Sequence, residues 1–168
     1  RHGRWIFQHN GEIHDFGRIR HALVSRIDPA IFATMRGATD TETMFQLALS
    51  FGFLESPKRG IQRMIEAVEE ERQKAGIERP FMMTIAASDG TSLYAYRYAS
   101  HGEPPSLYHS TSEAALQEAS GGTYTLPKDS VLIVSEPLDT VSKHWKAVPP
   151  SSALEIRPGF AEITSLFD

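Results

Sequence analysis

The spacing of the apolar residues changes at Pro80, and this change constrains the fold more than any other feature of the sequence. From Phe16 onward, apolar residues such as Ile19 and Leu23 recur every three or four positions, as one buried face of a helix requires. After Pro80, residues 81–87 alternate with a period of two, which is typical of a strand. Helices followed by hairpins predict an α+β fold in which helices cover antiparallel sheets.

Capping signals place the ends of three helices in the first half of the chain. A proline stops a helix or begins one, a Thr or Asp caps its start, and a glycine follows its end. These signals predict helices from Phe16 to Pro29, from Thr39 or Asp40 to about Ser50, and from Pro57 to Gly76.

Strands are predicted on both sides of the helical region. The first runs from Arg4 to His9, and Asn10-Gly11 is predicted to end it in a turn. A hairpin is predicted from 81–87 and 93–98 around Ser88-Asp89-Gly90. Further strands are predicted at 107–109, at 131–134 as a buried strand, and at 153–156 and 161–166 around Pro158-Gly159. No linker divides the chain and no nucleotide-binding glycine string is present, so residues 1–168 are predicted to form one domain that is not doubly wound.

Composition narrows the classes of function. The formal net charge is -4 and both signs of charge are mixed along the chain, so no broad basic surface is expected that would bind nucleic acid or a membrane. No apolar stretch is long enough to span a membrane. We therefore expect a soluble, cytoplasmic protein whose partner is a small molecule or another protein. The sequence contains no cysteine, which excludes disulfides and thiolate metal sites within it. His14 and His21 lack the spacing of a ligand pair, so we expect neither a metal nor a cofactor.

The pair Asn10-Gly11 allows two interpretations. It is the commonest dipeptide of a tight hairpin turn. It also offers an Asn side-chain amide and a neighbouring backbone N–H, two donors that can converge on an oxyanion, while a glycine lets a substrate approach the backbone.

Residues Thr39 to Glu42 are similarly open to two interpretations. A Thr followed by acidic residues is an ordinary helix start, because the helix dipole favours negative charge there. A functional Asp40 would instead face a cleft and pair with a substrate ammonium group.

Several segments occur along the chain in a characteristic order: Arg4 to Gly11, Gly37 to Glu42, Ser88-Asp89-Gly90, Arg97-Tyr98, and Val134 to Leu138. In this order they resemble the class II glutamine amidotransferases, and most closely the stand-alone branch of that family. The resemblance covers residues 4 to about 148. It implies an N-terminal nucleophile hydrolase fold, an αββα sandwich of antiparallel sheets. It also implies that residues 1–168 are one incomplete domain that lacks the nucleophile strand.

The resemblance also implies roles for five residues. Asn10 and Gly11 would form the oxyanion hole and Asp40 would bind the α-ammonium of glutamine. Thr39 and Glu42 would shape or support the Asp40 loop. The family's nucleophile is an N-terminal cysteine whose α-amino group serves as base, and since the sequence holds no cysteine we expect this stretch alone to be inactive. The implied reaction is hydrolysis of a γ-glutamyl amide through a thioester, with glutamine or another γ-glutamyl compound as substrate and a homodimer or an ammonia-accepting protein as a compatible partner.

Three alternatives remain open at this point. One is a γ-glutamyl hydrolase that trims a biosynthetic intermediate. Another is a non-catalytic subunit that senses glutamine. The third is an unrelated α+β domain in which Asn10-Gly11 is only a turn.

Overall fold

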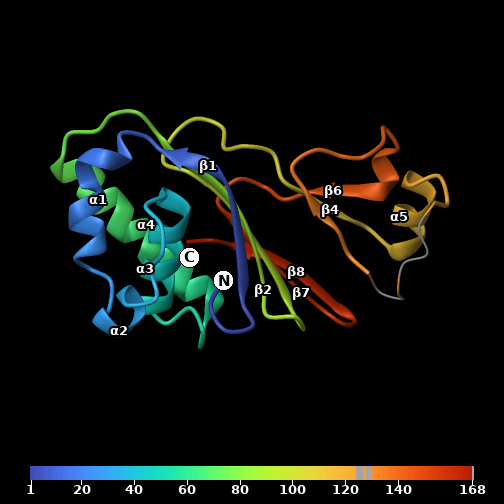
Figure 1. Cartoon of the computed structure of the whole chain (residues 1–168). Helices are drawn as coiled ribbons and strands as arrows, with labels where there is room; N and C mark the ends of the chain where they lie inside the picture. Colours follow the sequence, from blue (N-terminus) through green and yellow to red (C-terminus); the bar gives the residue numbers. More distant parts are fainter. Residues whose placement is uncertain (124–126, 128–129, 168) are drawn as a thin grey trace.

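The computed structural model describes residues 1–123, 127 and 130–167 of the chain. Helices α1 to α4 lie together on one face of a large sheet, and a smaller sheet with α5 lies on its other side (Figure 1). The helices are α1 (Phe16–Val24), α2 (Pro29–Phe32), α3 (Asp40–Ser50), α4 (Pro57–Lys74) and α5 (Glu113–Ala119), with a 3-10 turn, η1, at Ser142–His144. The strands are β1 (Ile6–Ile13), β2 (Phe81–Ser88), β3 (Leu93–Ala99), β4 (Tyr108–Ser110), β5 (Ile133–Val134), β6 (Trp145–Ala147), β7 (Ser152–Arg157) and β8 (Phe160–Ser165).

The large sheet has five strands in the order β1-β2-β3-β7-β8, and every neighbouring pair is antiparallel. Strand β1 pairs with β2 along its whole length, from Ile6 opposite Ser88 to Ile13 opposite Phe81. The small sheet has three strands in the order β5-β4-β6. The predicted α+β architecture with antiparallel sheets is therefore confirmed.

The main core lies between the helices and the large sheet. Alternation along β1 turns Phe7 toward α3, where its ring stacks on Phe45 with centroids 4.7 Å apart. Gly60 lets α4 approach the preceding loop, because a Cβ there would stand 2.6 Å from the Cα of Phe53. The predicted stripe of α4 is buried in this core, as Ile61, Met64, Ile65 and Val68.

A second, smaller core lies on the other face of the large sheet. It joins β3 and β7 to the segments that flank the small sheet, through Ala95, Leu107, Val148, Leu154 and Ile156. Among the described residues, no helix combines the length and the apolar character that crossing a membrane requires.

The structure confirms most predicted elements. Thr39 caps α3, Pro57 opens α4, the hairpin of β2 and β3 forms as predicted, and Pro158 and Gly159 separate β7 from β8. These elements have strong local signals, which do not depend on distant contacts.

Other predictions were wrong. The first helix ends at Val24, and Pro29 begins α2 instead of stopping α1, because Asp28 accepts the Ala30 N–H and caps the new helix. The buried strand predicted over residues 131–134 shrinks to the two half-buried residues of β5. The structure also contains three elements that were not predicted, α5, η1 and β6.

Candidate active site

Asn10 and Gly11 lie inside β1, so the predicted turn at this pair is wrong. They are paired with Thr84 and Met83 of β2, and the strand continues to Ile13. Gly11 has a φ of +141°, and a Cβ built on it would lie 2.1 Å from the carbonyl oxygen of Met82. A glycine is therefore required here by close packing within the sheet, and the alternative of a simple hairpin turn is excluded.

The Asn10 side chain is exposed. Side chains alternate between the two faces of a strand, so Asn10 points away from the helices while its neighbour His9 points toward them. The backbone of Asn10 is held by Thr84, whose hydroxyl donates to the Asn10 carbonyl oxygen at 3.3 Å. The Asn10 amide is thus presented from a fixed backbone on the open face of β1.

Asp40 is the first residue of α3, and its carboxylate reaches β1. Its Oδ2 accepts the backbone N–H of Ile13 at 3.2 Å, and its Oδ1 accepts the N–H of Thr41 at 2.7 Å. Both carboxylate oxygens are therefore oriented by backbone donors, one from the helix and one from the strand.

The loop before Asp40 is held by its own side chains. Thr39 Oγ1 accepts the N–H of Glu42 at 3.2 Å, which is the N-cap bond of α3. Glu42 in turn accepts the N–H groups of Arg36 and Gly37 at 2.8 and 2.6 Å. Thr39 and Glu42 thus fix the path of the chain into Asp40.

His9, which was not among the predicted site residues, forms a second contact between β1 and α3. Its Nδ1 lies 3.0 Å from the Thr41 hydroxyl, while its buried Nε2 has no hydrogen-bond partner among the described residues. Burial lowers the pKa of His9 below its usual value, against an opposing effect of the Asp40 charge. The neutral imidazole is therefore favoured, and α3 contacts β1 both before and after Asn10-Gly11.

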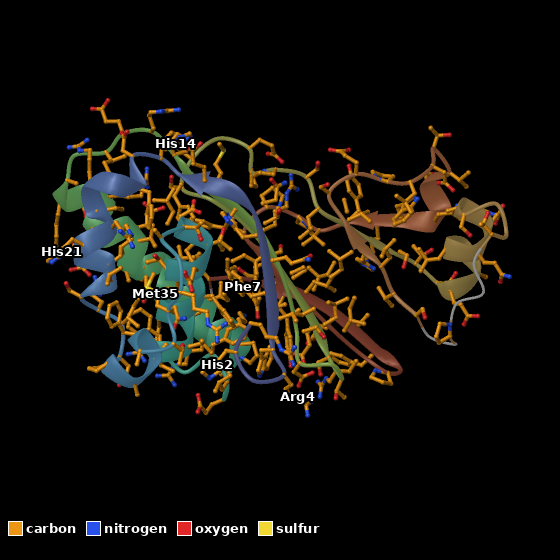
Figure 2. All side chains as sticks on the ribbon, viewed as in Figure 1. His2, Arg4, Phe7, His14, His21 and Met35 are labelled. Atoms are coloured by element: carbon orange, nitrogen blue, oxygen red, sulfur yellow. The ribbon has the colours of Figure 1, made fainter. Side chains whose placement is uncertain are left out.

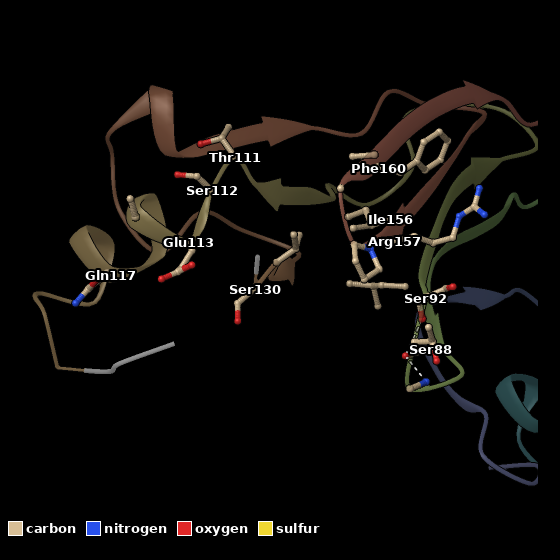
Figure 3. A pocket seen from close by; sticks show the side chains of 18 residues that line it. Ser88, Ser92, Thr111, Ser112, Glu113, Gln117, Ser130, Ile156, Arg157 and Phe160 are labelled. Carbon is tan, nitrogen blue, oxygen red and sulfur yellow. Dashed lines mark hydrogen bonds between the residues drawn. The ribbon is translucent and has the colours of Figure 1, made fainter. Parts of the chain in front are cut away.

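Neither described cavity is lined by Asn10, Gly11 or Asp40. The larger cavity has a volume of about 950 Å³ and lies between the β2–β3 turn, the β7–β8 turn and α5 (Figure 3). Hydroxyl groups of Ser88, Ser92, Thr111 and Ser112 line it. A glutamyl cavity shared by the predicted site residues stays a prediction.

Within the part of the chain that the structure describes, no group of three or more His, Asp or Glu side chains is placed to hold a metal ion. His14 and His21 lie far apart in Figure 2, and His14 instead contacts Glu12, with 3.0 Å between Nδ1 and Oε1.

Comparisons with known proteins place the chain among amidotransferases. No protein-family profile matches the sequence. The chain is 27% identical over 177 residues to the probable glutamine amidotransferase DUG3 of Saccharomyces cerevisiae, in a match that covers 90% of this chain and 49% of that protein. The chain thus spans about half the length of this curated relative.

Two solved structures share the fold at low identity. A glutamine phosphoribosylpyrophosphate amidotransferase from B. subtilis is 14% identical with a TM-score of 0.59, in a match that covers 96% of this chain and 29% of that one. A predicted glutamine amidotransferase from Pseudomonas aeruginosa is 20% identical with a TM-score of 0.53, covering 94% of this chain and 59% of that one. At these identities the similarity concerns the fold alone.

A third structure, described as a glutamine aminotransferase class-II domain protein from Silicibacter pomeroyi, is much more similar. It is 31% identical with a TM-score of 0.83, and the match covers 96% of this chain and 67% of that one. With this identity, coverage and shared fold, the chain belongs to the class II glutamine amidotransferase family.

Proposed function

We propose that this chain supplies the oxyanion donors and the ammonium-binding carboxylate of a glutamine amidotransferase that hydrolyses a γ-glutamyl amide. Asn10, through its side-chain amide, and Gly11, through its backbone N–H, stabilise the oxyanion. Asp40 binds the α-ammonium of the substrate, and Thr39 holds the Asp40 loop in place.

The observation that carries this proposal is the pair of contacts that α3 makes with β1 around Asn10-Gly11. Asp40 accepts the N–H of Ile13 on one side, and Thr41 contacts His9 on the other. These contacts hold the first turn of α3 against the strand that carries Asn10 and Gly11, which supports a site where a carboxylate recognises the amino acid and amide donors stabilise the transition state.

The proposed chemistry has two steps. A cysteine thiolate attacks the γ-carbonyl carbon, the negative charge collects on the oxygen, and the C–N bond breaks as nitrogen takes a proton and leaves as ammonia. Water then attacks the thioester, which releases glutamate and restores the thiol. Each oxyanion donor contributes about 2.7 to 4 kcal/mol to lowering the barrier.

The nucleophile is a cysteine that the 168 residues do not contain, and its own α-amino group acts as the base. We place the strand that bears it over the open face of β1, where the side chains of Gln8, Asn10 and Glu12 are exposed. A strand at that position would bring a thiol next to the Asn10 amide and would extend the structure toward a sandwich of two sheets between helices.

A glutaminase assay on the full-length protein tests this proposal. Asn10→Ala should lower kcat by about a hundredfold or more, because it removes a donor used in the transition state. Asp40→Ala should mainly raise KM, because it removes a contact present in the ground state as well. The control is Asp28→Ala, which removes the cap of another helix. Unchanged kinetics in both site variants would reject the assignment.

The same assay separates the alternatives. Binding of glutamine without release of ammonia would favour a glutamine sensor. Turnover of a γ-glutamyl dipeptide far above that of glutamine would favour γ-glutamyl trimming.

A further inference from the structure

A small pocket of about 310 Å³ lies on the helix-facing side of the large sheet, away from β1. The loop between α3 and α4 forms one wall, and strands β3, β7 and β8 form the floor. Its polar lining is dominated by carboxylates and phenols, from Glu55, Tyr94, Tyr96, Glu155 and Glu162.

Two of these carboxylates are direct cross-strand neighbours. Glu155 of β7 lies opposite Glu162 of β8, and both line the pocket. Like charges placed directly opposite each other destabilise a sheet unless a cation lies near them. Arg157 contacts Glu155, with Nε 2.9 Å from Oε1, and Lys58 is the positively charged residue of the lining. The three carboxylates, Glu55, Glu155 and Glu162, outnumber these two cations, so the net charge at the pocket is negative.

The floor of the pocket holds a polar atom that needs a partner. Tyr96 is 1% exposed, and its hydroxyl has no hydrogen-bond partner among the described residues. A buried hydroxyl without a partner is costly, so such groups in native proteins are usually bonded to protein, water or ligand. Burial raises the pKa of Tyr96 well above its usual value, so the phenol stays neutral and keeps both its O–H donor and an oxygen that accepts a hydrogen bond.

Tyr94 adds an aromatic ring to the acidic side of the pocket. It lies opposite Glu155 on the neighbouring strand and also lines the cavity. Phenol rings and carboxylates together attract organic cations, the rings through their negative faces and the carboxylates through their charge.

We propose that this pocket binds a small primary ammonium ion, with Glu155 and Glu162 neutralising its charge and the Tyr96 oxygen accepting one of its N–H groups. A primary ammonium carries three donors, which equals the number of acceptor side chains that Glu155, Glu162 and Tyr96 supply to the lining, whereas a quaternary ammonium carries none. The volume lies at the low end of ligand pockets, which limits the ligand to a small molecule. The site is separate from Asn10, Gly11 and Asp40.

Titration calorimetry of the full-length protein with ethylammonium chloride at low ionic strength tests the proposal. The expected result is saturable binding at one site, with weaker binding of tetramethylammonium chloride and none of potassium chloride or sodium acetate. Equal heats from ethylammonium and potassium would show screening of surface charge alone and would overturn it, as would the absence of saturation.

Two variants and a control locate the site. Glu162→Gln should weaken ethylammonium binding by about tenfold or more, because a hydrogen bond to a charged group is among the stronger ones. Tyr96→Phe keeps the ring, so it should weaken binding while leaving the unliganded melting temperature unchanged or higher. Glu66→Gln, on the exposed side of α4, should bind as wild type. Wild-type affinity in both pocket variants would place the ligand elsewhere and reject this site.

Discussion

His9 Nδ1 and the Thr41 hydroxyl lie 3.0 Å apart, and this contact joins β1 to the first turn of α3. His9 directly precedes Asn10 in β1, and Thr41 directly follows Asp40 in α3. The contact therefore links the proposed oxyanion donors to the proposed ammonium-binding carboxylate.

Removing the hydroxyl of this pair should destabilise the fold modestly. Thr41→Val keeps the shape of the side chain and deletes the contact, so we expect a loss of about 1 kcal/mol in the free energy of unfolding, measured by urea titration. Thr41→Ser keeps the hydroxyl and should retain most of the stability. A larger loss in Thr41→Ser than in Thr41→Val would assign the effect to packing of the methyl group instead of the hydroxyl contact.

Protonation of His9 should contribute to the pH dependence of the free energy of unfolding. Its pKa in the folded protein lies below the unfolded value of about 6.5, so the unfolded state takes up the proton first as the pH falls. The stabilising effect of neutral His9 is thus complete above pH 6.5 and declines as the pH falls toward the folded pKa. His9→Gln should flatten this part of a urea-midpoint profile between about pH 7.5 and 5. A variant profile parallel to wild type would contradict this.

The contribution of His144 to stability should depend on pH in the opposite direction to that of His9. It is 2% exposed, with Nδ1 2.8 Å from Asp139 and Nε2 3.0 Å from Glu118, and these hydrogen bonds raise its pKa. Its stabilising effect is therefore complete below about pH 6.5 and is lost as the pH rises through the folded value. The pKa values of Asp139 and Glu118 are lowered, so the stability that these two carboxylates contribute is lost when they are protonated in acid.

His144→Gln should consequently lose more stability at pH 5.5 than at pH 8.5, in paired thermal melts. Lys143→Gln, at an exposed neighbour that also contacts Glu118, serves as the control and should show a smaller difference between the two pH values.

Gly11 and Gly90 offer a matched pair of substitutions, because both have a positive φ. Gly90→Ala meets open space and should cost about 1 kcal/mol from backbone strain alone. Gly11→Ala also drives a Cβ into the carbonyl of Met82, so it should cost about 3 kcal/mol or more. Similar unfolding free energies for the two variants would contradict the close approach of β1 and β2.

Arg97 should be difficult to replace. It is buried and donates to the carbonyl oxygens of Pro104, Pro105 and Val148 and to the carboxylate of Glu103, at 2.7 to 3.0 Å. Arg97→Lys keeps the charge but not the planar fork, so we expect a loss of about 2 to 3 kcal/mol in denaturant unfolding.

The exposed Arg4 provides the comparison for Arg97. It contacts Asp89 and Thr91 at the hairpin turn, where solvent screens the charges. Arg4→Lys should change stability by less than about 0.5 kcal/mol. A comparable loss in both variants would show that the fork of Arg97 is not the cause.

Local sequence signals predicted the elements that depend on neighbouring residues. The Thr39 cap and the buried stripe of α4 need only a cap residue and helical spacing, and both formed as predicted. The turn at Asn10-Gly11 was wrong because the same dipeptide also fits a strand in which a distant carbonyl, that of Met82, approaches the backbone. A pattern of neighbouring residues in the sequence cannot predict this contact between two strands.

The candidate site could be predicted only as a set of residues. The order of the motifs pointed to Asn10 and Asp40, but the bond from Ile13 to Asp40 joins residues 27 positions apart in the sequence, and no periodicity encodes it. The partnership of His9 with Thr41 has the same origin, since it depends on how α3 docks on the sheet. Short elements such as β6 also escaped prediction, because β6 is defined by its pairing with β4, in which Trp145 lies opposite Ser110.

The two backbone bonds to Asp40 have a consequence for any cation that reaches it. Since one oxygen is held by Ile13 and the other by Thr41, the carboxylate has already given up its rotational freedom in the folded chain. A cationic ligand therefore binds a carboxylate that is already oriented. The affinity of the ligand is not reduced by the entropy cost of immobilising the Asp40 side chain.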